Sequence, residues 1–144
     1  MQEYPHHYLV TAGGREEGEV TVSSQGLESI ATTAPHQFGG PECTWSPETM
    51  LVASVANCYI LTFRAIALGS RFQWHSLECS VNGILDRVDN VTSFTCFELD
   101  VVLTAPKDCN LEKAERLLEK SEAVCLVTNS LSGEKKLNLR IEFA

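Results

Sequence analysis

Two cysteines stand in surroundings that favour thiol chemistry. Cys58 lies inside a long, uncharged, apolar segment that begins at residues 46–48, and Cys125 lies in a second apolar stretch, residues 123–131. A cysteine on an apolar helix is most often a small core residue without a chemical role. A thiol deep in a helix of this kind, with a second thiol available to it, suggests redox chemistry instead.

A cysteine attacks an electrophile as its thiolate, so Cys58 needs a group that favours its ionisation. The reference pKa of a thiol is about 8.5 and burial raises it, which leaves a small ionised fraction at neutral pH. Cys58 lies about three turns into its segment, whereas the helix dipole acts within roughly the first turn. An arginine is the natural source of positive charge, because it stays protonated and can also bridge to a carboxylate.

The segment that holds Cys58 has the features of a long helix. Ser46 suits the N-cap, Pro47 the first helical position, and Glu48 the positive end of the helix. Nothing stops the helix before Gly69, which gives about 22 residues. Apolar side chains occupy most of its circumference (Met50, Leu51, Val52, Val55, Tyr59, Ile60, Leu61, Phe63, Ile66, Leu68). We therefore expect a buried central helix that one small sheet cannot cover, and hence an obligate homodimer.

Alternating polar and apolar residues predict strands on both sides of this helix. Short runs before it indicate an antiparallel meander, followed by a loop over 33–45 (7–12, 19–23 and 27–32). Two longer runs, 76–88 and 91–103, meet at Asp89-Asn90, whose residue types suit a tight hairpin turn. A last run, 136–143, is apolar on one face. The expected fold class is α+β, with antiparallel sheets around the central helix.

A second helix is expected after Asn110, which can cap it. Its apolar residues form one stripe, and its charged residues form a solvated face that needs no functional explanation. Leu111, Leu118 and Cys125 are spaced by seven. If helical geometry continues through Glu122, Cys125 stays on the buried stripe and points toward the core.

Composition narrows the classes of protein to which the chain can belong. With 144 residues, 44% of them hydrophobic, we expect one domain over residues 1–144. The net charge of -8 disfavours nucleic acid as a partner, and the charge-free run 49–63 is shorter than a membrane span. The N-terminus lacks the pattern of a signal peptide, so we expect a cytoplasmic protein with reduced thiols. The histidines do not have metal-ligand spacing, so no metal is assigned (His6, His7, His36, His75).

The chain resembles the OsmC/Ohr family of thiol peroxidases, which act on organic hydroperoxides. The residues that carry the resemblance are Ser46-Pro47-Glu48-Thr49-Met50-Leu51, then Ala56-Asn57-Cys58-Tyr59, and finally Cys125 with Thr128-Asn129 behind it. Helix length, strand order and chain length agree as well. The resemblance implies an intertwined α+β homodimer with two active sites at its interface.

The resemblance also implies roles for individual residues. Cys58 corresponds to the reactive cysteine, Cys125 to the resolving cysteine, and Glu48 with Arg15 to the pair that holds the reactive thiolate. Arg64 is the alternative arginine, and the helix dipole alone would also favour Glu48 at its position. The chain departs from the family pattern at Leu126, where the family commonly has proline after the resolving cysteine.

The reaction expected from these residues is a peroxidase cycle. Cys58 thiolate attacks a hydroperoxide, its sulfenic acid condenses with Cys125, and an external dithiol reduces the disulfide. The resemblance points to organic or fatty-acid hydroperoxides, a dihydrolipoyl-type reductant and an antioxidant role under stress, without an organic cofactor or metal. The alternative is a non-catalytic dimer of the same fold that binds an apolar ligand or senses oxidation through its thiols.

Overall fold

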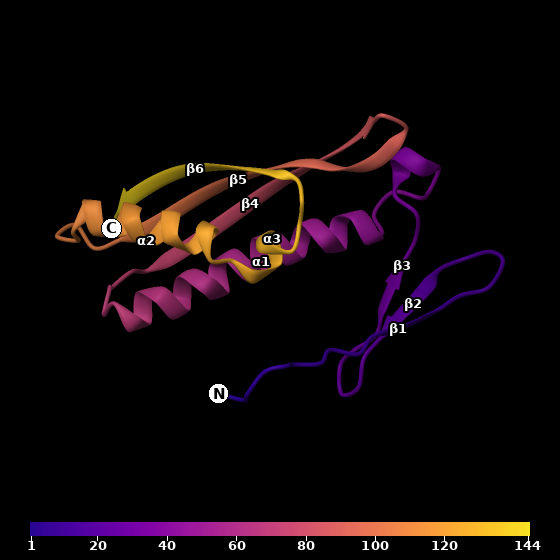
Figure 1. Cartoon of the computed structure of the whole chain (residues 1–144), viewed down its shortest axis with the longest axis horizontal. Helices are drawn as coiled ribbons and strands as arrows, with labels where there is room; N and C mark the ends of the chain where they lie inside the picture. Colours follow the sequence, from indigo (N-terminus) through magenta and orange to yellow (C-terminus); the bar gives the residue numbers. More distant parts are fainter. The chain divides into compact units, whose positions relative to one another are not determined.

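A computed structural model describes all residues, 1–144, and its chain divides into two compact units (Figure 1). The N-terminal unit comprises Met1–Met50 and the C-terminal unit Leu51–Ala144. Each unit contains one three-stranded sheet, and a long helix begins in the first unit and continues in the second. The α+β class expected from the sequence is confirmed, whereas a single subunit does not test the expected homodimer.

The N-terminal unit contains the predicted antiparallel meander. Its strands are β1 (Thr11–Gly13), β2 (Val20–Ser23) and β3 (Ile30–Thr32), in the order β1-β2-β3. All three are shorter than the alternating runs predicted, and residues 7–10 lie outside the sheet. A short 3-10 helix, η1 (His36–Phe38), interrupts the loop that follows. The loop is tied back to β3 by the Thr33 N–H, which donates to the Trp45 carbonyl at 2.9 Å.

The central helix α1 (Pro47–Gly69) begins at the predicted residue. The Ser46 hydroxyl oxygen accepts a hydrogen bond from the Thr49 N–H at 3.2 Å, and the Ser46 N–H donates to the Thr49 hydroxyl oxygen at 2.9 Å. Reciprocal bonds of this kind satisfy backbone donors that the first helical turn leaves free. The N-cap role of Ser46 is confirmed.

The sheet of the C-terminal unit has the order β4-β5-β6. β4 (Ser76–Val88) and β5 (Val91–Ala105) form an antiparallel hairpin, and Asp89 and Asn90 at its turn have φ values of 51° and 63°. Positive φ at both central residues is the geometry of a tight two-residue hairpin turn, as predicted. β6 (Glu134–Phe143), however, pairs with β5 in parallel. The expectation of purely antiparallel sheets is therefore wrong for this pair.

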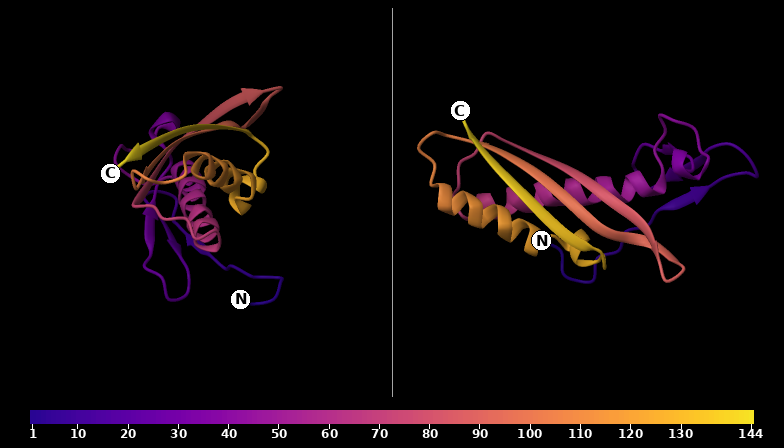
Figure 2. Two further views of the ribbon diagram at one scale, coloured as in Figure 1. Left: turned by 90° about the vertical axis from the view of Figure 1, so that its left-hand side faces the viewer. Right: turned by 90° about the horizontal axis from the view of Figure 1, so that it is seen from above.

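Parallel pairing of β5 and β6 requires a crossover, which two helices provide. α2 (Leu111–Ala123) is capped by the Asn110 side chain, which accepts from the Lys113 N–H at 2.8 Å, and α3 (Leu126–Asn129) follows after one irregular turn. Figure 2 shows α2 beside α1 under one face of the sheet. The second helix and its cap are confirmed.

The core of the C-terminal unit lies between this sheet face and the two helices. Alternate residues of β5 are buried, and α1 contributes a buried stripe at four-residue spacing (Val55, Tyr59, Phe63 and Ala67). Gly83 lets α1 come close to β4, because a Cβ atom there would lie 2.5 Å from a methyl group of Val52. The outer sheet face carries polar pairs such as Asn138 with Asp100, at 2.9 Å. One amphipathic sheet therefore covers one face of α1.

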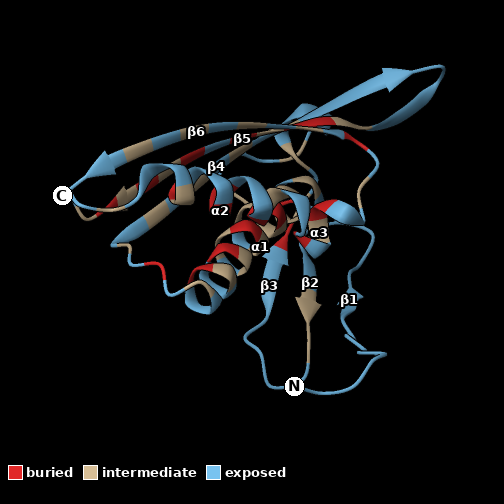
Figure 3. Ribbon diagram, turned by 60° about the vertical axis from the view of Figure 1, so that its left-hand side comes forward, coloured by how far each residue is buried: buried red, intermediate tan, exposed pale blue.

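The other face of α1 is exposed in the single chain (Figure 3), as expected for an apolar helix that one small sheet cannot cover. Leu61 and Leu68 are 52% and 80% exposed, and 22% of the most apolar window of the helix is buried. By length and composition α1 could also cross a membrane, contrary to the expectation from the run 49–63. Its buried stripe against the sheet instead fits a core helix whose second face is left uncovered by its own chain.

The buried hydroxyl of Tyr59 provides a test of this packing. It donates to the Leu118 carbonyl on α2 at 2.9 Å. Tyr59→Phe removes this buried hydrogen bond between α1 and α2, so we expect a loss of about 0.5–1.5 kcal/mol in the free energy of unfolding. Urea unfolding at fixed protein concentration measures it. Tyr8→Phe removes the hydroxyl of a tyrosine that is 88% exposed and should change the stability by less than about 0.5 kcal/mol. Equal effects of the two changes would contradict the assigned role of Tyr59.

Candidate active site

Cys58 is held by the packing of its neighbour in α1. Tyr59 is fully buried against the core, and Cys58, one position earlier, is only partly buried. Successive residues of a helix point about 100° apart, so Cys58 lies beside the buried stripe rather than on it. Its sulfur therefore borders the core and also retains access from outside.

Cys125 lies at the junction of the two crossover helices. α2 ends at Ala123, Val124 leaves helical geometry with φ -110° and ψ 7°, and Cys125 is the N-cap residue of α3. Its side chain is fully buried, as the seven-residue spacing predicts, although the helix does not continue to it. The burial of Cys125 thus comes from the docking of α3 rather than from an extended α2.

The two thiols lie near one another at the edge of the core of the C-terminal unit. Each is close enough to affect the pKa of the other, and neither cysteine is in a disulfide. They are separated by 67 positions in the sequence, so the fold and not local geometry brings them together. Two free thiols placed in this way can be converted to a disulfide by an oxidant.

The surroundings of Cys58 oppose its ionisation. Burial raises the pKa of the Cys58 thiol, and the hydrogen bond that it donates to Cys125 raises it further. The Val127 backbone N–H and the Thr62 hydroxyl donate to the Cys58 sulfur and act in the opposite direction, but they do not outweigh the first two effects. A Cys58 thiolate at neutral pH therefore needs a further source of positive charge.

The pKa of the Cys125 thiol shifts in the opposite direction, although burial acts to raise it as well. Hydrogen bonds to the sulfur from the Thr128 backbone N–H, from the Cys58 thiol and from the Val127 backbone N–H oppose that effect and lower the pKa of Cys125. The two backbone donors, Val127 and Thr128, lie in α3.

Thr62 lies one helical turn after Cys58 on α1. Its Oγ1 atom lies 3.8 Å from the Cys58 sulfur, within hydrogen-bond reach for sulfur. Residues four positions apart are neighbours on one face of a helix. Sequence reasoning did not identify Thr62, Val127 or Thr128 as part of the site, although the four-residue spacing of Cys58 and Thr62 was a usable signal.

Glu48, Arg15 and Arg64 do not form an ion pair within the chain. Glu48 lies in the first turn of α1, and one of its carboxylate oxygens is buried without a hydrogen-bond partner. Arg15 is exposed in the loop between β1 and β2. Arg64 is exposed on α1, six positions after Cys58 and thus on a different face of the helix. The roles of Glu48 and Arg15 stay predictions.

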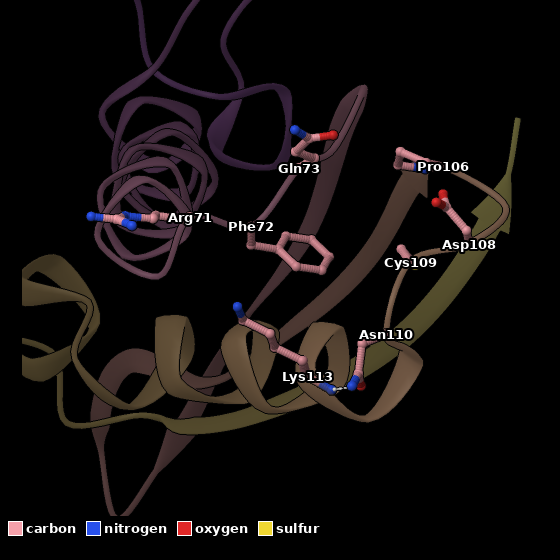
Figure 4. A pocket seen from close by; sticks show the side chains of 8 residues that line it. All are labelled: Arg71, Phe72, Gln73, Pro106, Asp108, Cys109, Asn110 and Lys113. Atoms are coloured by element: carbon pink, nitrogen blue, oxygen red, sulfur yellow. Dashed lines mark hydrogen bonds between the residues drawn. The ribbon is translucent and has the colours of Figure 1, made fainter.

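A surface hollow lies apart from the two thiols. A hollow of about 210 Å³ is found near the C-terminal end of α1 (Figure 4), lined by Arg71, Phe72, Gln73, Pro106, Asp108, Cys109, Asn110 and Lys113. Cys58 and Gly69, the last residue of α1, are eleven helical positions apart, or about 16 Å along the helix axis. The chain has no cluster of three or more residues that could hold a metal ion. The thiol pair is therefore the candidate active site.

Comparison with protein families identifies the chain. A sequence model of the OsmC-like protein family matches residues 39–140, which include all of α1 and both Cys58 and Cys125. The chain belongs to the OsmC-like family, as the resemblance of its sequence motifs indicated.

Individual relatives agree with this assignment. The uncharacterized protein YmaD of Bacillus subtilis is 27% identical over 141 residues, which cover 93% of this chain and 92% of that protein. An OsmC-like protein of unknown function from Vibrio cholerae has a similar structure, with a TM-score of 0.83, 21% identity and coverage of 94% and 100% of the two chains. An organic hydroperoxide resistance protein OsmC from Legionella pneumophila has a TM-score of 0.70, 23% identity and coverage of 97% and 99%. At these identities, the structural likeness establishes the fold.

The hydrogen bond between the thiols predicts an effect of Cys125 on Cys58. Cys125→Ala removes the acceptor that stabilises protonated Cys58, so the pKa of Cys58 should fall. Alkylation of Cys58 by iodoacetamide near neutral pH should become about two- to tenfold faster, since a net hydrogen bond contributes about 0.5–1.5 kcal/mol. Peptide mass spectrometry follows Cys58 as a function of pH.

Cys96→Ala is the matched control, because Cys96 is also buried but is not among the groups that affect the pKa of Cys58. An unchanged pH profile of Cys58 in Cys125→Ala would show that the two thiols do not share a proton in solution.

Proposed function

We propose that the protein is a cysteine-based peroxidase that reduces organic hydroperoxides to alcohols. The observation that carries the proposal is the contact between two free thiols, Cys58 and Cys125, in the core of an OsmC-like subunit. Some proteins of similar structure are named organic hydroperoxide resistance proteins. Six free cysteines fit a reducing compartment, for which we propose the cytoplasm.

The proposed cycle uses Cys58 as the attacking thiol. Its thiolate attacks the terminal peroxide oxygen, the O–O bond breaks, and the alkoxide leaves as an alcohol after taking a proton. Cys125 then attacks the sulfur of Cys58 sulfenic acid, which releases water and forms the disulfide. A dithiol reductant restores both thiols and is itself oxidised to a disulfide. Cys58 is the attacking residue because it is partly accessible, whereas Cys125 is fully buried.

The proposal requires a cation that one subunit does not place beside Cys58, because burial raises the pKa of this thiol. We propose that a homodimer supplies it. The exposed apolar face of α1 offers a surface for a second copy, and antiparallel crossing of two α1 helices would bring Glu48 and Arg15 of the partner toward Cys58. An arginine there would also satisfy the buried oxygen of Glu48.

Disulfide mapping tests the chemistry of the thiol pair. The reduced protein receives one equivalent of cumene hydroperoxide, free thiols are blocked, and disulfides are mapped by peptide mass spectrometry. We expect a Cys58–Cys125 disulfide within seconds in the wild type and in the control Cys109→Ser, and none in Cys58→Ser. Free Cys58 after the same exposure of the wild type would contradict the proposal.

The alternative function is a dimer that binds an apolar ligand or senses oxidation. The raised pKa of Cys58 favours it, because a thiol that stays protonated reacts slowly with peroxides. Turnover separates the two functions. An enzyme consumes many equivalents of cumene hydroperoxide when dihydrolipoamide is present, whereas a sensor reacts about once and stops.

Subunit mixing tests whether Arg15 serves the Cys58 of the other subunit. Cys58→Ser and Arg15→Ala should each be inactive alone, and a heterodimer of the two should regain up to about half of the activity of a wild-type dimer, since one of its two sites keeps both residues. Arg116→Ala, on the solvated face of α2, is the control and should remain active. Absence of recovery in verified heterodimers would exclude a site shared between subunits.

A further inference from the structure

The side chain of Thr62 is directed at the candidate reactive sulfur. Its Oγ1 atom is 3.8 Å from the Cys58 sulfur, one helical turn further along α1. The contact lies within one continuous helix, so it depends on neither the partner subunit nor the placement of the loops. Thr62 is partly buried, which limits competition from water for this hydrogen bond.

Other hydroxyl groups in the helices make a different bond. Each donates to a backbone carbonyl three or four residues earlier in its own helix (Ser54 to Leu51, Ser121 to Leu117, Thr128 to Cys125, Ser130 to Leu126). This back-bonding is the usual use of serine and threonine hydroxyls inside helices. Thr62 does not donate to a carbonyl, and its hydrogen-bond partner is the sulfur of Cys58. The Thr62 hydroxyl is therefore paired with the Cys58 sulfur instead of with a backbone carbonyl of the helix.

The direction of this hydrogen bond depends on the charge of Cys58. A protonated thiol can donate to Oγ1 or accept from it, whereas a thiolate can only accept. Ionisation of Cys58 thus makes the Thr62 hydroxyl the donor to a negative sulfur. Bonds to charged groups are stronger than neutral ones, so Thr62 stabilises the thiolate more than the thiol.

We propose that Thr62 is a positioning residue that favours ionisation of Cys58 over that of Cys125 and so selects the thiol that attacks the peroxide. The proposal rests on the proposed function, in which Cys58 is the attacking thiol. Among side chains outside the thiol pair, Thr62 is the one that supplies a hydrogen bond to the Cys58 sulfur. The Thr128 hydroxyl donates to the backbone carbonyl of Cys125 instead of to its sulfur.

The test compares two variants of Thr62 that differ in one hydroxyl group. Thr62→Val keeps the shape of the side chain and removes the donor, and Thr62→Ser keeps the donor. The full-length reduced protein is alkylated with iodoacetamide between pH 5 and about 10, a range that brackets ordinary thiol ionisation, and modification of Cys58 is quantified by peptide mass spectrometry. Cys43, exposed in a loop, is the internal control in every sample.

We expect Thr62→Val to move the Cys58 profile to higher pH and to slow alkylation near neutral pH about two- to tenfold. Thr62→Ser should stay within about twofold of the wild type, and the profile of Cys43 should not change. An unchanged Cys58 profile in Thr62→Val, or an equal shift in Thr62→Ser, would overturn the proposal. If Thr62→Val melts well below the wild type, Thr62→Ala replaces it under the same criteria.

This readout does not require peroxide or turnover. A shifted profile in Thr62→Val together with free Cys58 after peroxide treatment would support Thr62 but reject the peroxidase. An unchanged profile together with a Cys58–Cys125 disulfide would reject Thr62 and leave the peroxidase standing. The two proposals therefore fail separately.

Discussion

The packing of α1 against the β4–β6 sheet is the interaction on which the thiol pair depends. Tyr59 fills the core and its hydroxyl joins α1 to α2 through the Leu118 carbonyl. Cys58 is adjacent to Tyr59 in α1, and Cys125 follows the last turn of α2. This buried side chain and its hydrogen bond, with the rest of the core, thus hold α1 and α2 in their relative position. The relative position of the two sulfurs follows from this helix packing.

The same burial that brings the thiols together makes their ionisation unfavourable. Desolvation penalises a thiolate at both positions, and only hydrogen-bond donors within the subunit oppose it. Two features remain unsatisfied in the single chain, namely the apolar outer face of α1 and the buried oxygen of Glu48. The helix face lacks an apolar cover, and the Glu48 oxygen lacks a hydrogen-bond donor. One additional subunit that contributes both an apolar helix face and a guanidinium would satisfy them together.

Local rules predicted most of the elements from the sequence. Ser46 and Asn110 begin helices because their side chains cap free N–H groups, and Asp89-Asn90 forms the turn because both residues tolerate positive φ. The alternation in β6 revealed its buried face but not its direction, because alternation is the same in parallel and antiparallel strands. The contact between Cys58 and Cys125 was implied by family resemblance alone, since it joins elements far apart in the sequence. Thr62 was overlooked because a helix hydroxyl is ordinarily satisfied by its own backbone.

The parallel pairing of β5 with β6 also bears on how the chain folds. β6 is separated from its partner β5 in the sequence by the whole crossover of α2 and α3. Pairings between distant segments form slowly because the loop between them has to close first. Until β6 has paired, one edge of β5 lacks its hydrogen-bond partners. An unpaired strand edge can pair with another chain, so the incompletely folded protein is more prone to aggregation than the completed fold.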